Sequence, residues 1–160
     1  MATHIMEMPA RPGLAERLHQ ATVLAERMPI SLLALMMRVA LAAVFIKSGM
    51  TKIANFDITI SLFQDEYMVP LLPPALAAVL ATVTELGCSS LILAGFATRL
   101  AALPLLSLTF VIEVFVYPEN WVEHMTWAAM LLFLVAHGAG KLSLDHFIRK
   151  AFERRWGYAS

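Results

Sequence analysis

The stretch that decides the fold runs from residue 74 to residue 99 and reads PALAAVLATVTELGCSSLILAGFATR. It is a long apolar run with one carboxylate, Glu85, in its middle. With a rise of roughly 1.5 Å per residue, that carboxylate lies about 15 Å from either end of a helix. A charged group at such a depth in a bilayer is costly, so we expect it to face other helices and to have a partner. The helical stripe around Glu85 is small and polar, and it comprises Ala78, Ala81, Thr82, Cys88, Ser89 and Ile92.

Composition places the chain among membrane proteins. Of its 160 residues, 59% are hydrophobic and 15% are charged, whereas a soluble domain is about half apolar and about a quarter charged. The apolar residues gather in four runs, each near the roughly 17–25 residues that cross a bilayer. The alternative, a soluble bundle, would need a polar stripe on every helix, which these runs mostly lack. The sequence predicts an all-α integral membrane four-helix bundle over residues 30–141, with helices at about 30–52, 74–96, 100–117 and 121–138.

Charge distribution along the chain predicts its orientation. Basic residues precede the first run, occupy the turn between the second and third runs, and follow the fourth, whereas the other two connections are acidic. Because membrane proteins keep an excess of Lys and Arg in their cytoplasmic loops, this pattern places both termini in the cytoplasm of a bacterial inner membrane. The basic residues are Arg11, Arg17, Arg27, Arg99, Lys141, Arg149, Lys150, Arg154 and Arg155; the acidic ones are Asp57, Asp65, Glu66, Glu119 and Glu123.

Three segments outside the apolar runs have patterns of their own. Residues 1–29 contain an amphipathic segment, which is typical of a helix on the inner membrane surface or of one that binds a partner. In the connection 53–73 we expect a periplasmic cap, with a short interfacial helix over the mouth of the bundle. Residues 142–160 form an amphipathic basic tail suited to anionic lipid of the inner leaflet, and Ser143 or Asp145 can cap its helix.

Depth along the helices predicts which buried charges meet. Arg38 lies about 12 Å from the cytoplasmic end of the first run, and Glu85 lies about 15 Å from the same side. Helices that follow each other in sequence usually pack side by side, so we expect an Arg38–Glu85 ion pair inside the bundle. Such a pair would either hold Glu85 in its charged form within a functional site or simply fix the register of two helices.

A second polar group lies nearer the outer surface. Glu113 lies about 20 Å from the cytoplasmic side, near the depth of Lys47, Lys52, His124 and Trp127. A carboxylate, an imidazole and an aromatic ring around a cavity suit proton-coupled binding of a small amphipathic molecule such as a quinol. Alternatively, His124 is an interfacial histidine beside Trp121, and Glu113 has a structural role. The candidate site comprises the catalytic residues Arg38, Glu85, Glu113 and His124 and the substrate-binding residues Trp127, Lys52 and Tyr67.

Metal and thiol chemistry are not favoured by the sequence. Cys88 is the single cysteine, so no disulfide forms within the chain, and a small packing residue is its simplest role. His124 and His137 belong to one run and lie near opposite membrane surfaces, which prevents them from binding one haem together. The ten methionines are scattered among core positions, where methionine is an ordinary filler. We expect no metal site and no intrinsic cofactor, with a quinone as the candidate ligand.

Five short motifs occur in order along the chain. They are Arg38 early in the first run, Gly49–Lys52 at its end, Glu85–Gly87 in the second run, Gly95–Ala102 at the next turn, and Gly138–Asp145 after the fourth. Together, over about residues 30–148, they resemble the DoxX family of small four-helix inner-membrane proteins. The resemblance implies a membrane subunit linked with quinone-dependent oxidoreductase systems, including systems that handle thiol or oxidative stress.

Two functions follow as expectations. The first is a quinone-interacting subunit of a membrane oxidoreductase, and the second is a non-enzymatic anchor or small transporter for a periplasmic peptide or metal-stress system. The second draws on residues 63–67 and 117–121, which are similar to members encoded beside iron-dependent peptide-modifying enzymes and small metal-responsive peptides. The expected partners are the lipid bilayer, an oxidoreductase or periplasmic protein, and a second copy in a homodimer. The formal net charge is zero, and we expect no nucleic acid.

Overall fold

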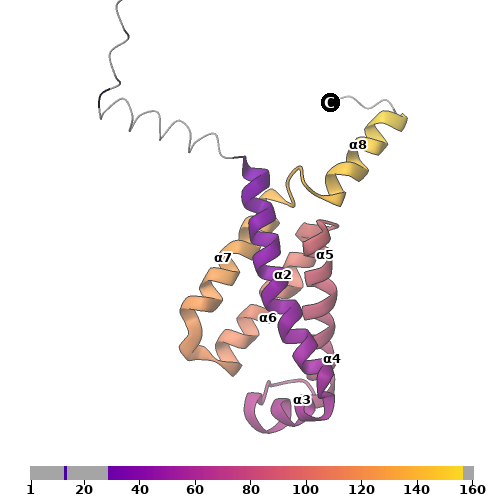
Figure 1. Ribbon diagram of the computed structural model, residues 1–160. Helices are drawn as coiled ribbons and strands as arrows, with labels where there is room; N and C mark the ends of the chain where they lie inside the picture. Colours follow the sequence, from indigo (N-terminus) through magenta and orange to yellow (C-terminus); the bar gives the residue numbers. More distant parts are fainter. Residues whose placement is uncertain (1–12, 14–28, 157–160) are drawn as a thin grey trace, which may run out of the picture.

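The computed structural model describes residue 13 and residues 29–156, and in this part of the chain it contains helices and no strand (Figure 1). The amphipathic segment expected within residues 1–29 lies outside the described residues, apart from Gly13 and Pro29. In chain order the elements are α2 (Ile30–Ala54), α3 (Phe56–Leu62), η1 (Phe63–Tyr67), α4 (Pro74–Val83), η2 (Thr84–Cys88), α5 (Ser89–Ala94), α6 (Thr98–Val111), η3 (Ile112–Val116), η4 (Pro118–Asn120), α7 (Trp121–His137) and α8 (Leu144–Trp156).

Within the described residues, three helical segments are long and apolar enough to cross a membrane. They are Ile30–Ala54, Pro74–Ala94 and Thr98–Val116. Helix α7 has 17 residues, which is at the short end of the range for a span. All four segments begin and end within about two residues of the predicted bounds, because the apolar runs and the residues that break them are unambiguous.

Local sequence signals explain where these helices start and stop. Pro74 occupies the first helical position of α4, where its missing N–H costs nothing. Gly95 ends α5 at φ +70, and its N–H donates to Ile92 O while the next N–H, of Phe96, donates to Leu91 O, which together make a Schellman motif. Gly138, at φ +76, ends α7. The turns that the glycines predicted are therefore present.

The long segments pack around one shared core. Helix α2 packs against α5 and α7, and α6 packs most extensively against α7. In α2 the residues Arg38, Ala42, Phe45 and Gly49 are buried, and so are most positions of the stripe around Glu85. Large apolar side chains also cover the outside, where a bilayer would meet them. The core includes Ala34, Leu41, Phe45, Ile92, Ala101, Ala102, Leu105, Leu131 and Leu134.

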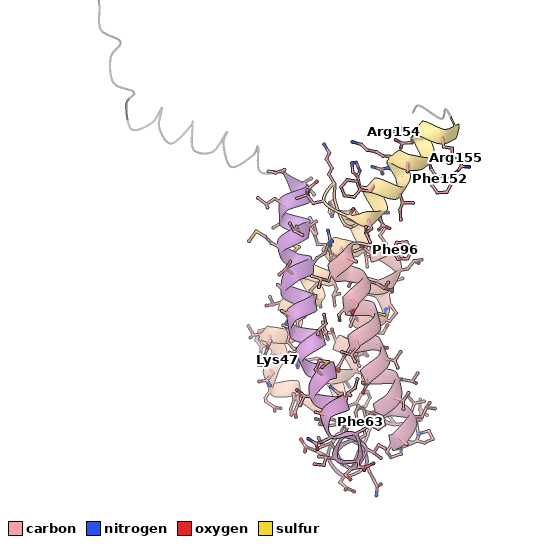
Figure 2. All side chains as sticks on the ribbon, turned by 45° about the vertical axis from the view of Figure 1, so that its right-hand side comes forward. Lys47, Phe63, Phe96, Phe152, Arg154 and Arg155 are labelled. Carbon is pink, nitrogen blue, oxygen red and sulfur yellow. The ribbon has the colours of Figure 1, made fainter. Side chains whose placement is uncertain are left out.

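The two ends of this assembly differ in shape. At one end, called here the cap end, α3 and η1 fold back against α4 through Phe63. This is the short helix expected in the connection 53–73. At the opposite end, called here the tail end, α8 leaves the core beside the first turns of α2 (Figure 1). Figure 2 shows Phe63 at the cap end and Phe96, Phe152 and Arg154 at the tail end.

Candidate functional site

Three π-helical turns carry polar residues at the cap end. Turn η1 contains Tyr67, η2 contains Glu85 and η3 contains Glu113. A π-turn inserts an extra residue into a helix and is frequent at functional sites. All three turns contribute residues to the wall of one cavity, called here the cap-end cavity. The chain therefore departs from regular α-helix three times around the same space.

The cap-end cavity has a volume of about 540 Å³ and is mostly apolar. Five of the predicted site residues line it: Lys52, Tyr67, Glu85, His124 and Trp127. Apolar walls with a few convergent polar groups are typical of binding sites for small molecules. Its apolar lining includes Val44, Phe45, Leu62, Leu108, Val111 and Ile112.

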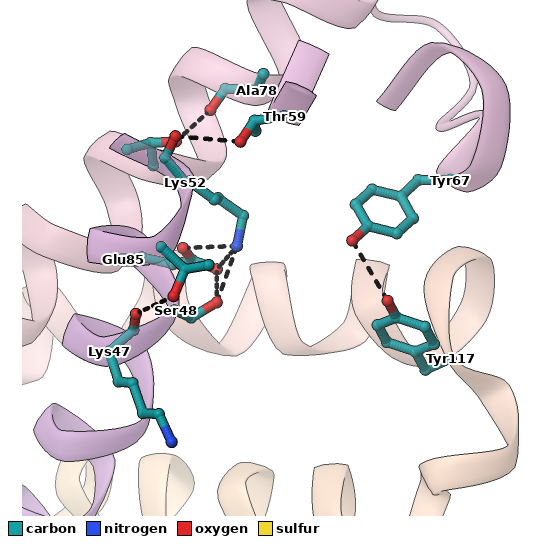
Figure 3. A network of polar contacts seen from close by, with 10 residues as sticks. Lys47, Ser48, Lys52, Thr59, Tyr67, Ala78, Glu85 and Tyr117 are labelled. Carbon is teal, nitrogen blue, oxygen red and sulfur yellow. Dashed lines mark hydrogen bonds and ion pairs between the residues drawn. The ribbon is translucent and has the colours of Figure 1, made fainter. Parts of the chain in front are cut away.

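One wall of the cavity holds an ion pair between α2 and η2. Lys52 Nζ lies 2.8 Å from Glu85 Oε1 and 2.9 Å from Oε2, and Ser48 Oγ donates to Oε1 at 3.2 Å (Figure 3). The Glu85 side chain is 2% exposed and that of Lys52 is 18% exposed. The partner that the buried carboxylate required is therefore present, and it also receives a hydroxyl hydrogen bond.

The predicted Arg38–Glu85 ion pair is wrong. Glu85 pairs with Lys52, and Gly49 also lies next to it, since a Cβ built at Gly49 would lie 3.3 Å from Glu85 Cβ. The prediction placed the start of the first run and the end of the second run at one membrane level. In the structure α2 extends past the end of α5, so Arg38 reaches Ile92 rather than Glu85.

Arg38 instead binds backbone carbonyls at the tail end. Its Nε donates to Ile92 O at 2.8 Å and its Nη2 to Leu93 O at 2.7 Å. Its Nη1 donates to Ala139 O at 3.1 Å and to Leu142 O at 2.7 Å. These carbonyls belong to the last turn of α5 and to the loop after α7, where helix ends leave acceptors unsatisfied. Arg38 therefore holds three segments together and takes no part in the cap-end cavity.

A second ion pair lies between η3 and α7. Glu113 Oε2 lies 2.7 Å from His124 Nδ1, which is one of the four residues expected near the depth of Glu113. His124 is buried at 4% exposure and lines the cavity, whereas Glu113 is 31% exposed and is not part of the cavity wall. The Trp127 ring lies 5.1 Å from the His124 ring, between centroids. Glu113 therefore orients the His124 ring from outside the cavity wall.

A tyrosine pair joins the cap to the end of the third long segment. The hydroxyl groups of Tyr67 and Tyr117 lie 3.4 Å apart, and the rings are in edge contact with centroids 5.9 Å apart (Figure 3). Burial first, and then the hydrogen bond and charge of Tyr117, raises the pKa of Tyr67 above its ordinary value. Tyr67 is therefore a neutral hydrogen-bonding group over the whole physiological range.

Comparison with known families identifies the chain. The family model for DoxX matches residues 33–118, which is more than half of the sequence. The chain belongs to the DoxX family. No curated protein and no solved structure shows a significant match. The matched range contains Lys52, Tyr67, Glu85 and Glu113 and ends before His124.

Two residues of this DoxX site escaped the sequence analysis. Ser48 lies one helical turn before Lys52, and the Lys52 ammonium donates to its hydroxyl at 2.9 Å. Tyr117 follows Glu113 by four residues, on the face that already contained a carboxylate. A polar residue four positions from a candidate charge lies on the same face of the helix, and this spacing would have identified both Ser48 and Tyr117. In the described residues no three His, Cys, Asp or Glu side chains are grouped closely enough to hold a metal ion.

Proposed function

We propose that this DoxX protein crosses a bacterial inner membrane four times with both termini in the cytoplasm, and that it binds the headgroup of a quinone or quinol as a subunit of a membrane oxidoreductase. The observation that carries this proposal is the cap-end cavity, in which an apolar space of about 540 Å³ meets the buried His124. The apolar runs and the family support the membrane location. The acidic connections at the cap end support its periplasmic side.

The residues present fit a quinone headgroup. The ring of Trp127 lies in edge contact with Phe45, with centroids 5.4 Å apart, and both line the cavity. They offer an aromatic surface for a flat ring. The hydroxyl of Tyr67 offers a hydrogen bond to a ring oxygen. The ammonium of Lys52 donates to Ser48 and to both oxygens of Glu85, so it contributes positive charge to the wall rather than a free donor. The charges at the wall are already paired, so a neutral ligand would leave no buried charge without a partner.

His124 is the residue that would exchange protons. A bound quinone supplies a ring whose two oxygens gain protons on reduction and lose them on oxidation. With Nδ1 held by Glu113 Oε2, the other ring nitrogen of His124, Nε2, remains for a ligand. The Glu113 carboxylate fixes the tautomer of the ring and balances the positive charge that the ring acquires with a second proton. Glu113 is partly exposed and so connects His124 toward the surface.

Electron transfer in this proposal belongs to a partner subunit. The chain contains a single cysteine, so it has no dithiol pair that could form a disulfide within itself. The chain would bind the quinone and move protons, and the partner would carry the electrons. This division predicts that the isolated chain binds a quinone without oxidising or reducing it.

The test is native mass spectrometry with lipid extraction on protein purified gently from its own membrane. We expect a co-purified quinone that is lost in His124→Ala and Glu113→Gln. Each variant has a matched control: His137→Ala removes an exposed histidine from the other end of α7, and Glu119→Gln removes an exposed carboxylate near the cavity. If the controls lose as much quinone as the site variants, or if no quinone is found, the proposal fails.

A second candidate function is a non-enzymatic anchor or small transporter for a periplasmic peptide or metal-stress system. It is favoured by the cap, because α3 and η1 supply Ile58, Leu62 and Phe63 to the cavity wall. In that case, replacing the cap residues would abolish capture of a protein partner, while His124→Ala would matter little. Retention of a protein partner, without a quinone, would give this function precedence.

A further inference from the structure

A second cavity lies at the tail end, far from the candidate quinone site. This tail-end basin has a volume of about 600 Å³ and lies between the start of α2, the α5–α6 connection, the end of α7 and the start of α8. Its lining includes three cationic side chains, Arg99, Lys141 and Arg149, and one carboxylate, Asp145. The quinone proposal uses none of these residues.

The single carboxylate of the basin is already engaged. Asp145 Oδ1 accepts the N–H of Ala97 at 2.8 Å, and Oδ2 accepts the N–H of Thr98 at 3.3 Å. These two N–H groups begin α6, where a negative charge also complements the helix dipole. Asp145 therefore stabilises a helix start, and the three cations of the basin remain in excess.

The imidazole of His146 positions one of the three cations. Arg149 Nη2 lies 3.2 Å from His146 Nδ1, and Arg149 Nε also approaches the exposed Glu153 at 3.7 Å. Desolvation, followed by the charges of Lys150, Arg149 and Lys141, lowers the pKa of His146. The ring is therefore neutral at pH 7, and its Nδ1 accepts the hydrogen bond from Arg149.

The surroundings place the basin at the level of lipid headgroups. Leu100 lines the basin and is 72% exposed. The adjoining helix α8 exposes the apolar side chains Leu144, Phe147, Ile148 and Phe152, and it also carries exposed basic residues, among them Arg149 and Lys150. A helix of this kind lies in the plane of the interface with its apolar side among the acyl chains. In a membrane protein of this family, the basin would thus open where phosphate groups are densest.

We propose that the tail-end basin binds the phosphate group of an anionic phospholipid. Arg99, Lys141 and Arg149 supply charge-assisted hydrogen bonds to the phosphate oxygens, and Arg presents a planar fork that suits them. Leu100 and the apolar side of α8 contact the acyl chains. Basic pockets between membrane helices on the cytoplasmic side are known to hold anionic headgroups in this way. A bound lipid would also tie α8 to the α5–α6 connection.

The test measures lipid retained by the full chain in native mass spectrometry. The protein is exchanged from mixed vesicles of equal parts dioleoylphosphatidylglycerol and dioleoylphosphatidylcholine into a mild detergent. We expect one phosphatidylglycerol to be retained in preference to phosphatidylcholine. The triple variant Arg99→Gln, Lys141→Gln, Arg149→Gln should lower this retention by about tenfold or more. All three side chains are exposed, so folding should persist, and the thermal unfolding midpoint checks this.

The matched control removes the same charge elsewhere. Lys47→Gln, Arg154→Gln, Arg155→Gln also loses three exposed cations but none from the basin. Retention that falls equally in both triple variants would reduce the effect to general surface charge and overturn the proposal. Equal retention of phosphatidylcholine, or full displacement of the lipid by millimolar inorganic phosphate, would also overturn it. If the basin triple variant fails to fold, the single changes Arg99→Gln and Lys141→Gln give the same comparison, each against Arg154→Gln.

Discussion

Buried charged side chains have different kinds of partner at the two ends of the molecule. At the tail end, Arg38 is 2% exposed and directs its guanidinium donors to four backbone carbonyls. At the cap end, Lys52 and His124 are paired with carboxylates and still line a cavity. The donors of Arg38 are used by the backbone and hold the fold together, whereas His124 uses only Nδ1 for Glu113 and keeps Nε2 for the proposed ligand. The contrast between the two ends therefore lies in whether a buried charged group also faces a cavity.

Replacing Arg38 at the tail end should have the largest effect on the stability of the fold. Arg38→Met would leave four carbonyls without a donor and remove the link between α5 and the loop after α7. We expect a loss of about 5 kcal/mol or more in the free energy of unfolding, or no folded protein at all. Denaturant titration in detergent micelles measures it, and Arg154→Met is the control because that residue is exposed on α8. A loss below about 1 kcal/mol would contradict the structural role of Arg38.

Breaking the ion pair at the cap end should cost less, because Lys52 is partly exposed. Lys52→Met would leave the buried Glu85 carboxylate with only Ser48 as a partner, and we expect a loss of about 3 kcal/mol. The double variant Lys52→Met, Glu85→Met removes both charges and should recover more than half of that loss. A double-mutant cycle on the same unfolding measurement tests the coupling. Additive losses would mean that the pair is not an energetic unit.

The tight packing of Gly95 against Arg38 predicts the next largest effect on stability. A Cβ at Gly95 would lie 2.6 Å from both Arg38 Nη2 and Ser143 Cβ, and Gly95 has φ +70. Gly95→Ala should therefore lower the free energy of unfolding by about 2 kcal/mol. Gly87→Ala is the matched control, since a Cβ there meets nothing within 4 Å, and it should leave stability unchanged or raise it slightly. Similar results for the two glycines would contradict the close approach.

The smallest effect belongs to the tyrosine pair of the cap. The pKa of Tyr67 is raised in the folded state, so its contribution to stability is complete below the unfolded pKa of about 10 and is lost as pH rises from there. Cap stability should accordingly be flat from pH 6 to about 9 and fall above about pH 10. In Tyr67→Phe this alkaline loss should shrink. Hydrogen exchange of the cap amides against pH measures it, and an unchanged alkaline loss in the variant would contradict the assignment.

Sequence reasoning predicted the helices and placed Glu113 near the depth of His124. Apolar runs bounded by Pro and Gly predicted the segments, and the small and polar stripe around Glu85 is mostly buried. The Glu113–His124 contact was predictable because a short connection fixes the register of the two helices it joins. The long connection between α2 and α4 gives no such register.

The hydrogen-bond partners of Arg38 could not be predicted from depth along the helices, for a physical reason. Depth was counted from the first residue of the first run and from the last residue of the second run, but α2 has 25 residues and projects past the end of α5. That shift moves Arg38 to the last carbonyls of α5 and brings Lys52 to Glu85. Backbone carbonyls at helix ends also carry no sequence signal, so an arginine that binds them looks like an unpaired charge. The sequence therefore does not determine how far one helix is shifted along its axis relative to its neighbour.

The most direct test of the cap-end site is the fluorescence of Trp127 during titration with a short-chain quinone. Trp121 and Trp156 are first replaced by Phe, so that Trp127 is the only tryptophan. Because Trp127 lines the cavity and lies 5.1 Å from His124, between ring centroids, a bound quinone should quench it saturably. We predict saturation that is abolished by His124→Ala and preserved in His137→Ala. Quenching that rises linearly with quinone, and equally in both variants, would contradict a quinone site at this end.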